Sequence, residues 1–428
     1  MKKRILSILL ASVVVVSLAG GCGTKKGEST GSESDGGKTQ LTVMINGGDP
    51  NWKKAVEETA KKFMEANENA EIKIEKSGSG MYLDYLKTKQ AVGEFGDVVE
   101  IKDPNAFSDS GILAQMPESI SELVENPIQY NGKTFIVPTI RQTQGVIYNK
   151  KIFRDLGIQE PETYQDFLDI CEKIKESGVD PLLVCGGDLW HMAFWVNHFM
   201  RTDLTGKNPD WEKQRTEKNA SWTDEDAVTM MSHIQELFDK GYVQDGFMST
   251  ADSQTPAILT SGTAAMCFTG PWMLPQIEEA DPNFEAGWFF VPNDAGERYA
   301  FNDVGSGWSI SENCKEDEAK YQVAQEFLEF YYSKDNYSEV LKATNTLPAT
   351  KEDITYEATA VQEDLMNKFL SDDTTKSTVQ LGDIDTPDGF RDFAYKTVQN
   401  LLMGEISQEE ALESMDKEWD KCVEAQNQ

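Results

Sequence analysis

Apolar residues follow two regular spacings in the first part of the chain. Short strand-like runs occur at Leu41-Thr-Val-Met-Ile45, at Glu71 to Glu75 and at Asp97-Val-Val-Glu-Ile101. Between the first two runs, apolar residues recur at i, i+3, i+4, i+7, i+8, i+11 and i+12, the stripe of an amphipathic helix: Trp52, Ala55, Val56, Thr59, Ala60, Phe63 and Met64. The order strand, helix, strand, helix, strand predicts the opening of a parallel α/β sheet.

A second set of elements begins at Gly145-Val-Ile-Tyr148, which reads as a strand. Thr163-Tyr-Gln-Asp166 is a helix start of the Ser/Thr-x-x-acid type, and the helix's predicted buried stripe is Tyr164, Phe167, Leu168, Cys171 and Ile174. Further predicted elements are the strands 264–268, 287–291 and 307–310 and helices around 321–331, 388–403 and 407–422. The fold class is therefore α/β.

Chain length and net charge limit the domain organisation and the class of partner. A chain of 428 residues exceeds what one hydrophobic core usually serves, so two lobes are expected. The 73 acidic residues outnumber the 40 basic ones, for a net charge of -33, and no Lys/Arg cluster offsets this. Such a surface repels nucleic acid and anionic headgroups, which excludes nucleic acid as a partner. The acids lie between apolar residues at helical spacing and predict solvated faces.

The N-terminus has the pattern of an export signal. Basic residues at Lys2 to Arg4 precede an apolar run, and the segment ends in small residues at Leu18-Ala-Gly-Gly-Cys22; it is too short for a membrane-spanning helix. We expect residues 1–21 to be a signal peptide. A cysteine at the cut resembles the lipobox of bacterial lipoproteins, which implies that Cys22 is acylated and anchors the protein to the membrane. Residues 22–40 are mostly small and polar and predict a flexible tether, so we expect a lipid-anchored protein on the extracytoplasmic face, extracellular or periplasmic.

The cysteines and histidines predict neither a metal nor a cofactor. After Cys22 the five cysteines, Cys171, Cys185, Cys267, Cys314 and Cys422, lack CxxC or CxxH spacing, so buried free thiols are expected, with Cys171–Cys185 or Cys185–Cys267 left open as pairs. His191 and His198 lie two helical turns apart without a third ligand, and a hydrogen-bonded structural role is expected for them.

Four segments, in this order, carry a resemblance to a known family. They are Leu41 to Phe63, Tyr130 to Phe153, Ser261-Gly-Thr-Ala-Ala-Met-Cys-Phe-Thr-Gly-Pro-Trp272, and Gly404 to Ala411. Together they resemble the bacterial extracellular solute-binding proteins of ABC sugar importers, the maltose-binding-protein-like group. The resemblance implies a monomeric receptor that captures a carbohydrate, without altering it, and delivers it to the permease subunits.

The same resemblance implies a two-lobed fold of the type II periplasmic-binding-protein kind, with a ligand cleft that closes by hinge bending. By position, the hinges are expected near 139–144, 301–306 and 345–348. Lobe one then takes 41–140 and 306–346, and lobe two takes 145–301 and 349–428.

A sugar cleft needs aromatic rings for stacking and planar polar groups for hydrogen bonds, and the chain has 9 Trp. Trp272, after the strand 264–268, falls where the family has a stacking tryptophan. Trp190 is expected on the wall of lobe two, whereas Trp195 is expected to pack. Trp308 follows the second crossover and has two readings, cleft wall or buried strand.

Polar candidates occur at strand ends and crossovers. Asn46 and Asp49 end the first strand, and Glu100 is an acid within an apolar run, where it must reach the cleft or find a partner. The crossovers contribute Gln142, Asp303 and Asn345, and Arg391 falls where the maltose-binding relative has a tryptophan. Arg141 is expected to pair with an acid. The departures at Gln142 and Arg391 predict a ligand other than maltose, with a uronate left open through Arg391.

The alternative hypothesis is that the protein is an enzyme. The chain lacks GxSxG, HExxH, Walker A and GxGxxG motifs, so binding is favoured over turnover. The remaining alternatives are a secreted glycoside-acting enzyme with a carboxylate pair in the cleft and a receptor for a non-sugar polar solute.

Overall fold

The computed structural model describes residues 37–78, 82–102, 105–108, 110–302, 307–352, 354–383 and 385–426. Cys22, the leader and most of the tether lie outside these ranges, as does Asp303, so the expectations for them stay predictions.

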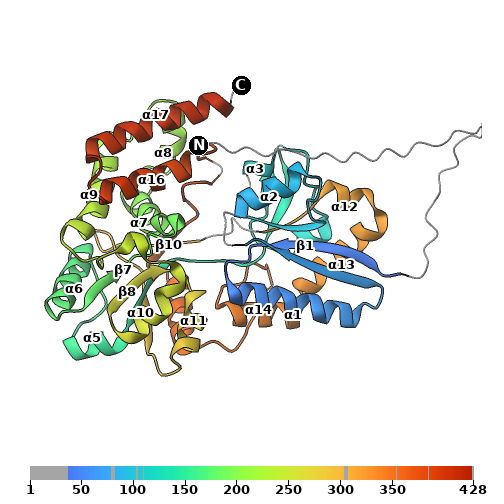
Figure 1. The fold of residues 1–428 in the computed structure, drawn as a ribbon, viewed down its shortest axis with the longest axis horizontal. Helices are drawn as coiled ribbons and strands as arrows, with labels where there is room; N and C mark the ends of the chain where they lie inside the picture. The colour runs from blue at the N-terminus through green and yellow to red at the C-terminus, as the bar shows by residue number, and fades with distance from the viewer. Residues whose placement is uncertain are drawn as a thin grey trace, which may run out of the picture. The chain divides into compact units, whose positions relative to one another are not determined.

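Figure 1 shows the order and arrangement of the elements. The strands are β1 (Thr39–Ile45), β2 (Ala70–Lys76), β3 (Val98–Ile101), β4 (Ile128–Tyr130), β5 (Lys133–Pro138), β6 (Gly145–Asn149), β7 (Asp180–Leu183), β8 (Ala264–Thr269), β9 (Ala286–Phe289), β10 (Arg298–Phe301), β11 (Gly307–Ile310) and β12 (Thr374–Ser377). The helices are α1 (Pro50–Ala66), α2 (Tyr82–Ala91), α3 (Asn105–Ser108), α4 (Glu118–Ser121), α5 (Lys150–Leu156), α6 (Tyr164–Glu176), α7 (Met192–Phe199), α8 (Trp211–Thr216), α9 (Glu225–Asp239), α10 (Thr255–Ser261), α11 (Met273–Ala280), α12 (Glu312–Glu316), α13 (Glu318–Tyr331), α14 (Lys334–Thr344), α15 (Ala360–Leu370), α16 (Phe390–Leu402) and α17 (Gln408–Gln426). Short helical turns are η1 (Leu189–His191), η2 (Met200–Leu204), η3 (Phe247–Ser249) and η4 (Asp252–Gln254).

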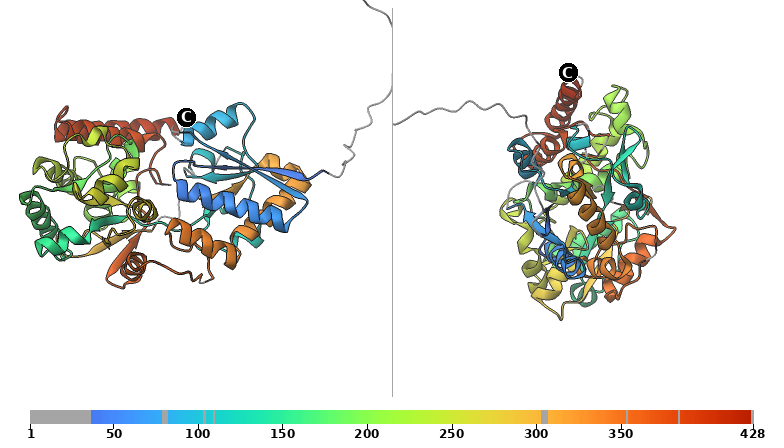
Figure 2. Two further views of the ribbon diagram at one scale, coloured as in Figure 1. Left: turned by 60° about the horizontal axis from the view of Figure 1, so that its bottom comes forward. Right: turned by 90° about the vertical axis from the view of Figure 1, so that its right-hand side faces the viewer.

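The six-stranded sheet of lobe one has the order β2-β1-β3-β11-β5-β4. Strands β2, β1 and β3 are parallel, as the opening pattern predicts, and β11 runs antiparallel to β3 and β5. Alternation along β1 sends Val43 and Ile45 into a core with α1, whereas Met44 packs on the other face with residues of α2. Helices α1 and α14 lie side by side in both views (Figures 1 and 2).

The four-stranded sheet of lobe two has the order β7-β8-β6-β9. One face, with Val146 and Phe268, belongs to a core shared with α6, α7, α9, α16 and α17. The other face, with Ile147 and Cys267, packs against residues of α10, α11 and α15. A small two-stranded parallel sheet joins β10 to β12. The predicted two-lobed α/β fold is confirmed.

Helix starts follow the local sequence. Thr163 caps α6 with a reciprocal capping box, in which its side chain accepts from the backbone N–H of Asp166 and the Asp166 carboxylate accepts in return. Asp49 caps α1, with Pro50 in the first turn, where a missing N–H costs nothing.

The buried free thiols predicted from spacing are confirmed among the described residues. All five are buried and none is in a disulfide: Cys171, Cys185, Cys267, Cys314 and Cys422. Neither Cys171–Cys185 nor Cys185–Cys267 forms a disulfide. Burial raises the pKa of the Cys185 thiol to about 12, which leaves it protonated. Within the described ranges, no helix has the length and apolar character needed to cross a membrane.

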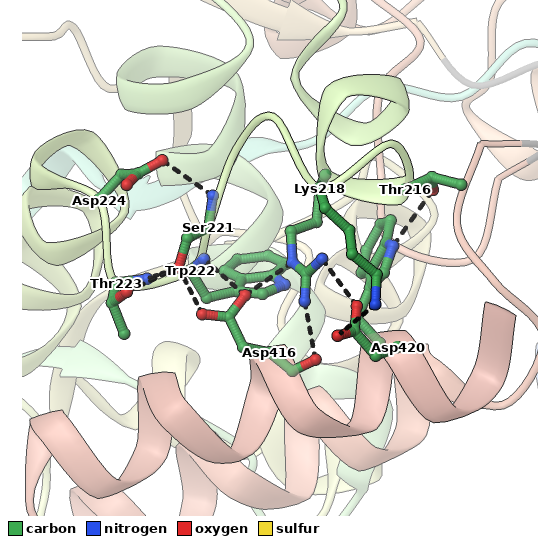
Figure 3. Close-up of polar contacts among 10 residues, drawn as sticks. Thr216, Lys218, Ser221, Trp222, Thr223, Asp224, Asp416 and Asp420 are labelled. Carbon is green, nitrogen blue, oxygen red and sulfur yellow. Dashed lines mark hydrogen bonds and ion pairs between the residues drawn. The ribbon is translucent and has the colours of Figure 1, made fainter. Parts of the chain in front are cut away.

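The C-terminal helix α17 is fixed to lobe two by charge. The Arg215 side chain, 4% exposed, donates from Nε to Asp416 Oδ1 (2.6 Å) and from Nη1 to Asp420 Oδ1 (2.9 Å). Figure 3 shows Asp416 also accepting from Ser221 and from the backbone of Trp222, while Lys218 reaches Asp420. Residues 215–222, which precede α9, are thereby tied to α17.

Replacing Arg215 by methionine is expected to lower the free energy of unfolding by about 2–4 kcal/mol, because partly buried carboxylates lose their cation. Lys218→Met is the matched control. Its side chain is 66% exposed at 3.3 Å from Asp420, so a change of about 0–1 kcal/mol is expected. Urea denaturation measures both, and equal effects would contradict the role of Arg215.

Candidate functional site

A polar pocket lies where β1, β3 and the first crossover meet. Its lining residues are Asn46, Asp49, Trp52, Glu100, Lys102, Thr139, Ile140 and Gln142. Asn46 follows β1 and Lys102 follows β3, so both belong to the carboxyl edge of neighbouring parallel strands, where open α/β sheets bind ligands. The structure thus brings together four of the predicted residues, Asn46, Asp49, Glu100 and Gln142.

The Glu100 carboxylate contacts three other lining residues of this pocket. It lies two residues after Val98 and shares that residue's face of the sheet, with 2% of it exposed. Its Oε2 accepts from the Asn46 backbone N–H (2.8 Å) and from Trp52 Nε1 (3.0 Å), and Lys102 Nζ lies 3.5 Å from Oε1. The buried carboxylate has found partners, as its position requires, and these partners belong to the pocket itself.

Asp49 is both a helix cap and a wall of the pocket. Its Oδ1 accepts from the Asn51 backbone N–H (2.8 Å). Burial raises the pKa of the Asp49 carboxyl above its ordinary value; the backbone N–H groups of Asn51 and Trp52 and the Lys102 ammonium oppose this, and the charge of Asp252 adds to it.

The first and third crossovers are bonded to each other. Arg141 and Leu347 form a two-residue antiparallel bridge, with N–H···O distances of 2.8 and 2.9 Å. Tyr337 ties the same two segments together, because its hydroxyl donates to the Thr139 carbonyl (2.9 Å) and accepts from the Ala349 N–H (3.0 Å). The carbonyls of residues 137–139 also accept from the hydroxyls of Tyr331 and Tyr332. The start of the first crossover is thus held by lobe one.

On lobe two, the predicted tryptophans share one aromatic cluster. Trp190 is 39% exposed and meets Phe194 edge to face at 5.6 Å between ring centroids. Trp272 is partly buried and lies 6.2 Å from the same Phe194 ring. Its indole lies back over Gly270: a Cβ added there would be 1.7 Å from a ring carbon. Only glycine at 270 leaves the ring its place.

A histidine and two aspartates lie next to this aromatic cluster. His191 Nε2 and Asp252 Oδ1 are 2.7 Å apart, and the Asp188 side chain accepts from the Asp252 N–H (2.8 Å). His198 is buried, and burial holds its pKa well below the ordinary value, so it stays neutral. No metal-binding group of three His, Cys, Asp or Glu side chains occurs within the described ranges.

Other predicted residues lie elsewhere. Trp308 is fully buried in the core of lobe one, 5.7 Å from Trp52, so its cleft reading is corrected in favour of a core strand. Asn345 is 6% exposed and ends α14 in a left-handed conformation (φ 54°), which asparagine tolerates better than most residues. Arg391 packs on Gly382 and donates from Nε to Asp392 Oδ1 (2.9 Å), and it does not line the pocket.

The two expectations for neighbouring residues are met. Trp195 is buried at 3% exposure, and Arg141 forms an ion pair with Glu125. Sequence reasoning missed Lys102, although it lies only two residues after Glu100, directly after β3. It also missed Asp252, for which no sequence signal exists, because its partner His191 is distant in the chain.

The arrangement is that of a two-lobed solute receptor, with polar groups on one lobe and aromatic rings on the other. Residues 46–338 match the model of the bacterial extracellular solute-binding protein family. The chain belongs to this family, and the resemblance noted from the sequence is confirmed.

The individual relatives described next have low sequence identity to this chain. The chain is 25% identical over 304 residues to the "Multiple sugar-binding protein" of Streptococcus mutans, covering 67% of this chain and 72% of that protein. It is 23% identical to the "Diacetylchitobiose binding protein DasA" of Streptomyces coelicolor, over 81% of this chain and 82% of the relative. A solved "Chitin oligosaccharide binding protein" superposes with a TM-score of 0.80 at 21% identity, covering 90% of this chain and 99% of that one, which establishes a common fold.

Gly270→Ala is expected to displace the Trp272 ring and to lower the free energy of unfolding by about 1–3 kcal/mol, since the added methyl group overlaps the indole. Near-UV circular dichroism and urea denaturation measure the two effects. Gly78→Ala is the matched control, because no atom lies within 4 Å of its added Cβ. A Gly270→Ala protein with the native near-UV spectrum would contradict this placement.

Proposed function

We propose that the protein is a membrane-anchored extracytoplasmic receptor that captures a sugar, an oligosaccharide in particular, by hinge closure and delivers it to an ABC permease. It works as a monomer, alters no bond of the ligand and needs no cofactor or nucleic acid. The proposed lobes are 41–140 with 306–346 and 145–301 with 349–428. The observation that carries the proposal is the pocket itself, which draws Asn46 and Asp49 from lobe one and Gln142 from a crossover.

The chemistry of the two lobes supports a carbohydrate ligand. Carboxylate and amide groups accept from and donate to sugar hydroxyls, and the faces of Trp190 and Trp272 suit the C–H face of a pyranose. Relatives named for sugars and for diacetylchitobiose point the same way. Because Gln142 follows the bridged residue Arg141, a ligand bound there touches the segment on which closure depends.

The rival reading, a glycoside-acting enzyme, needs a carboxylate pair available to a substrate. Glu100 is engaged by Trp52, by the backbone of Asn46 and by Lys102, so it is poorly placed to act as an acid or a nucleophile. Arg141 and Arg391 kept a receptor for a non-sugar solute open; Arg141 pairs with Glu125, and Arg391 donates from Nε to Asp392.

The test is a thermal-shift and calorimetric screen of mono- and oligosaccharides, raffinose and diacetylchitobiose among them. A ligand at a hundredfold excess over its Kd is expected to stabilise the protein by about 2.7 kcal/mol, and saturating ligand is expected to compact it in solution scattering. Trp272→Ala should remove most of the affinity, whereas Leu370→Ala, at a 63% exposed position, should not. Saccharides recovered as fragments would establish the enzyme instead, and the absence of any binding would refute the receptor.

The membrane anchor is proposed from Cys22 and the resemblance to the lipobox. Metabolic labelling with a palmitate analogue in a bacterial host is expected to label the wild-type protein and to place it in the membrane fraction. Cys22→Ser is expected to abolish both, and Cys171→Ser, at a buried thiol, serves as the control. A Cys22→Ser protein that still takes up the lipid would refute the anchor.

A further inference from the structure

The pocket of lobe one is unevenly charged. Among its described lining residues are two carboxylates, Asp49 and Glu100, and one ammonium, Lys102. Glu100 is directed at protein groups through both oxygens, with Oε2 bonded to Asn46 and Trp52 and Oε1 facing Lys102. Of the charged lining residues, Asp49 and Lys102 are therefore the two with hydrogen-bonding capacity left for a ligand, and Asn46 and Gln142 line the same pocket.

Lys102 is positioned by its neighbour in the strand. Lys102 follows β3 directly, and its Nζ lies 3.5 Å from Oε1 of the buried Glu100 carboxylate. An ammonium carries three N–H donors, and the ion pair with Glu100 at 3.5 Å is longer than a hydrogen bond, so these donors remain for a ligand. The side chain is 38% exposed, whereas Glu100 is 2% exposed, so the carboxylate is the fixed partner and the ammonium faces the open side.

The pocket is small. Its cavity of about 50 Å³ has room for roughly four water molecules at ~10–15 Å³ each. A hydroxyl or hydroxymethyl group of a larger ligand matches this volume. The pocket therefore suits a single substituent at one end of a ligand.

We propose that Lys102 is a specificity-determining residue, whose ammonium, positioned by Glu100, donates to an uncharged hydroxyl-bearing end of the sugar while Asp49 accepts from that same end. The inference rests on the proposed function and narrows its ligand class to neutral saccharides. A sugar hydroxyl both donates and accepts, so it satisfies the two groups at once. A uronate or phosphate in its place brings a further negative charge next to Asp49 and Glu100, with only Lys102 to compensate among the described lining residues.

The experiment is calorimetry of the full-length mature protein with three probes: raffinose, diacetylchitobiose and digalacturonate. At least one neutral probe is expected to bind, and digalacturonate is expected to bind at least a hundredfold more weakly. Lys102→Met is expected to weaken the neutral probe ten- to a hundredfold, because a charge-assisted hydrogen bond is lost. Lys61→Met, an exposed lysine of α1 outside the pocket, is the control and should bind as the wild type does.

A double-mutant cycle tests the positioning role of Glu100. Glu100→Gln keeps an acceptor for Asn46 and Trp52 but loses the charge that holds Lys102. If Glu100 acts through Lys102, the double variant binds no more weakly than Lys102→Met alone, whereas a purely structural role gives additive losses. Melting curves of each variant show that it is folded.

The failures are distinguishable. If none of the neutral saccharides in the wider screen binds the wild type, the proposed function fails and this inference fails with it. If a neutral saccharide binds but Lys102→Met leaves its Kd unchanged, or digalacturonate binds as tightly, the receptor stands and the role of Lys102 is refuted.

Discussion

The buried carboxylate of Glu100 is the constraint on which the pocket depends. Charge in the middle of a sheet is unfavourable unless donors surround it, and here the donors come from three separate segments: the end of β1, the first turn of α1 and the residue after β3. Satisfying one carboxylate therefore fixes the turn at Asn46, the indole of Trp52 and the direction of Lys102. The Tyr82 hydroxyl donates to the Glu100 carbonyl (2.8 Å) and holds the strand from the other side.

A second set of polar contacts holds the start of the first crossover in place. The hydroxyls of Tyr331, Tyr332 and Tyr337 donate to backbone carbonyls at the entry to the first crossover, and each is buried, which raises the pKa of its phenol. The bridge between Arg141 and Leu347 extends this hold to the third crossover. The residue directly after the bridged Arg141 is Gln142, which lines the pocket.

Much of the fold followed from local pattern. The stripe from Trp52 to Met64 predicted α1, and the short strand-like runs at 41–45 and 97–101 predicted strands that the sheet pairs as parallel neighbours. Trp190 and Trp272 stay predictions as ligand-binding residues; Trp190 lies in the short turn η1, and Trp272 follows the end of β8. Trp308 was ambiguous for a physical reason: a tryptophan in a short apolar strand after a crossover has the same sequence whether it faces a cleft or a core. Only packing against Trp52 and Tyr331 places it inside.

The sequence alone determined the α/β class and the family, since these depend on periodicity, spacing and residue type over short stretches. The tertiary structure decided which polar groups share a pocket, because Asn46, Glu100 and Gln142 meet only when β1, β3 and a crossover are brought to one edge of the sheet. It also decided that Arg391 pairs with Asp392 and that Lys102 stands beside Asp49. Charge compensation is a property of distances in space, and the spacing of residues along a chain does not encode it.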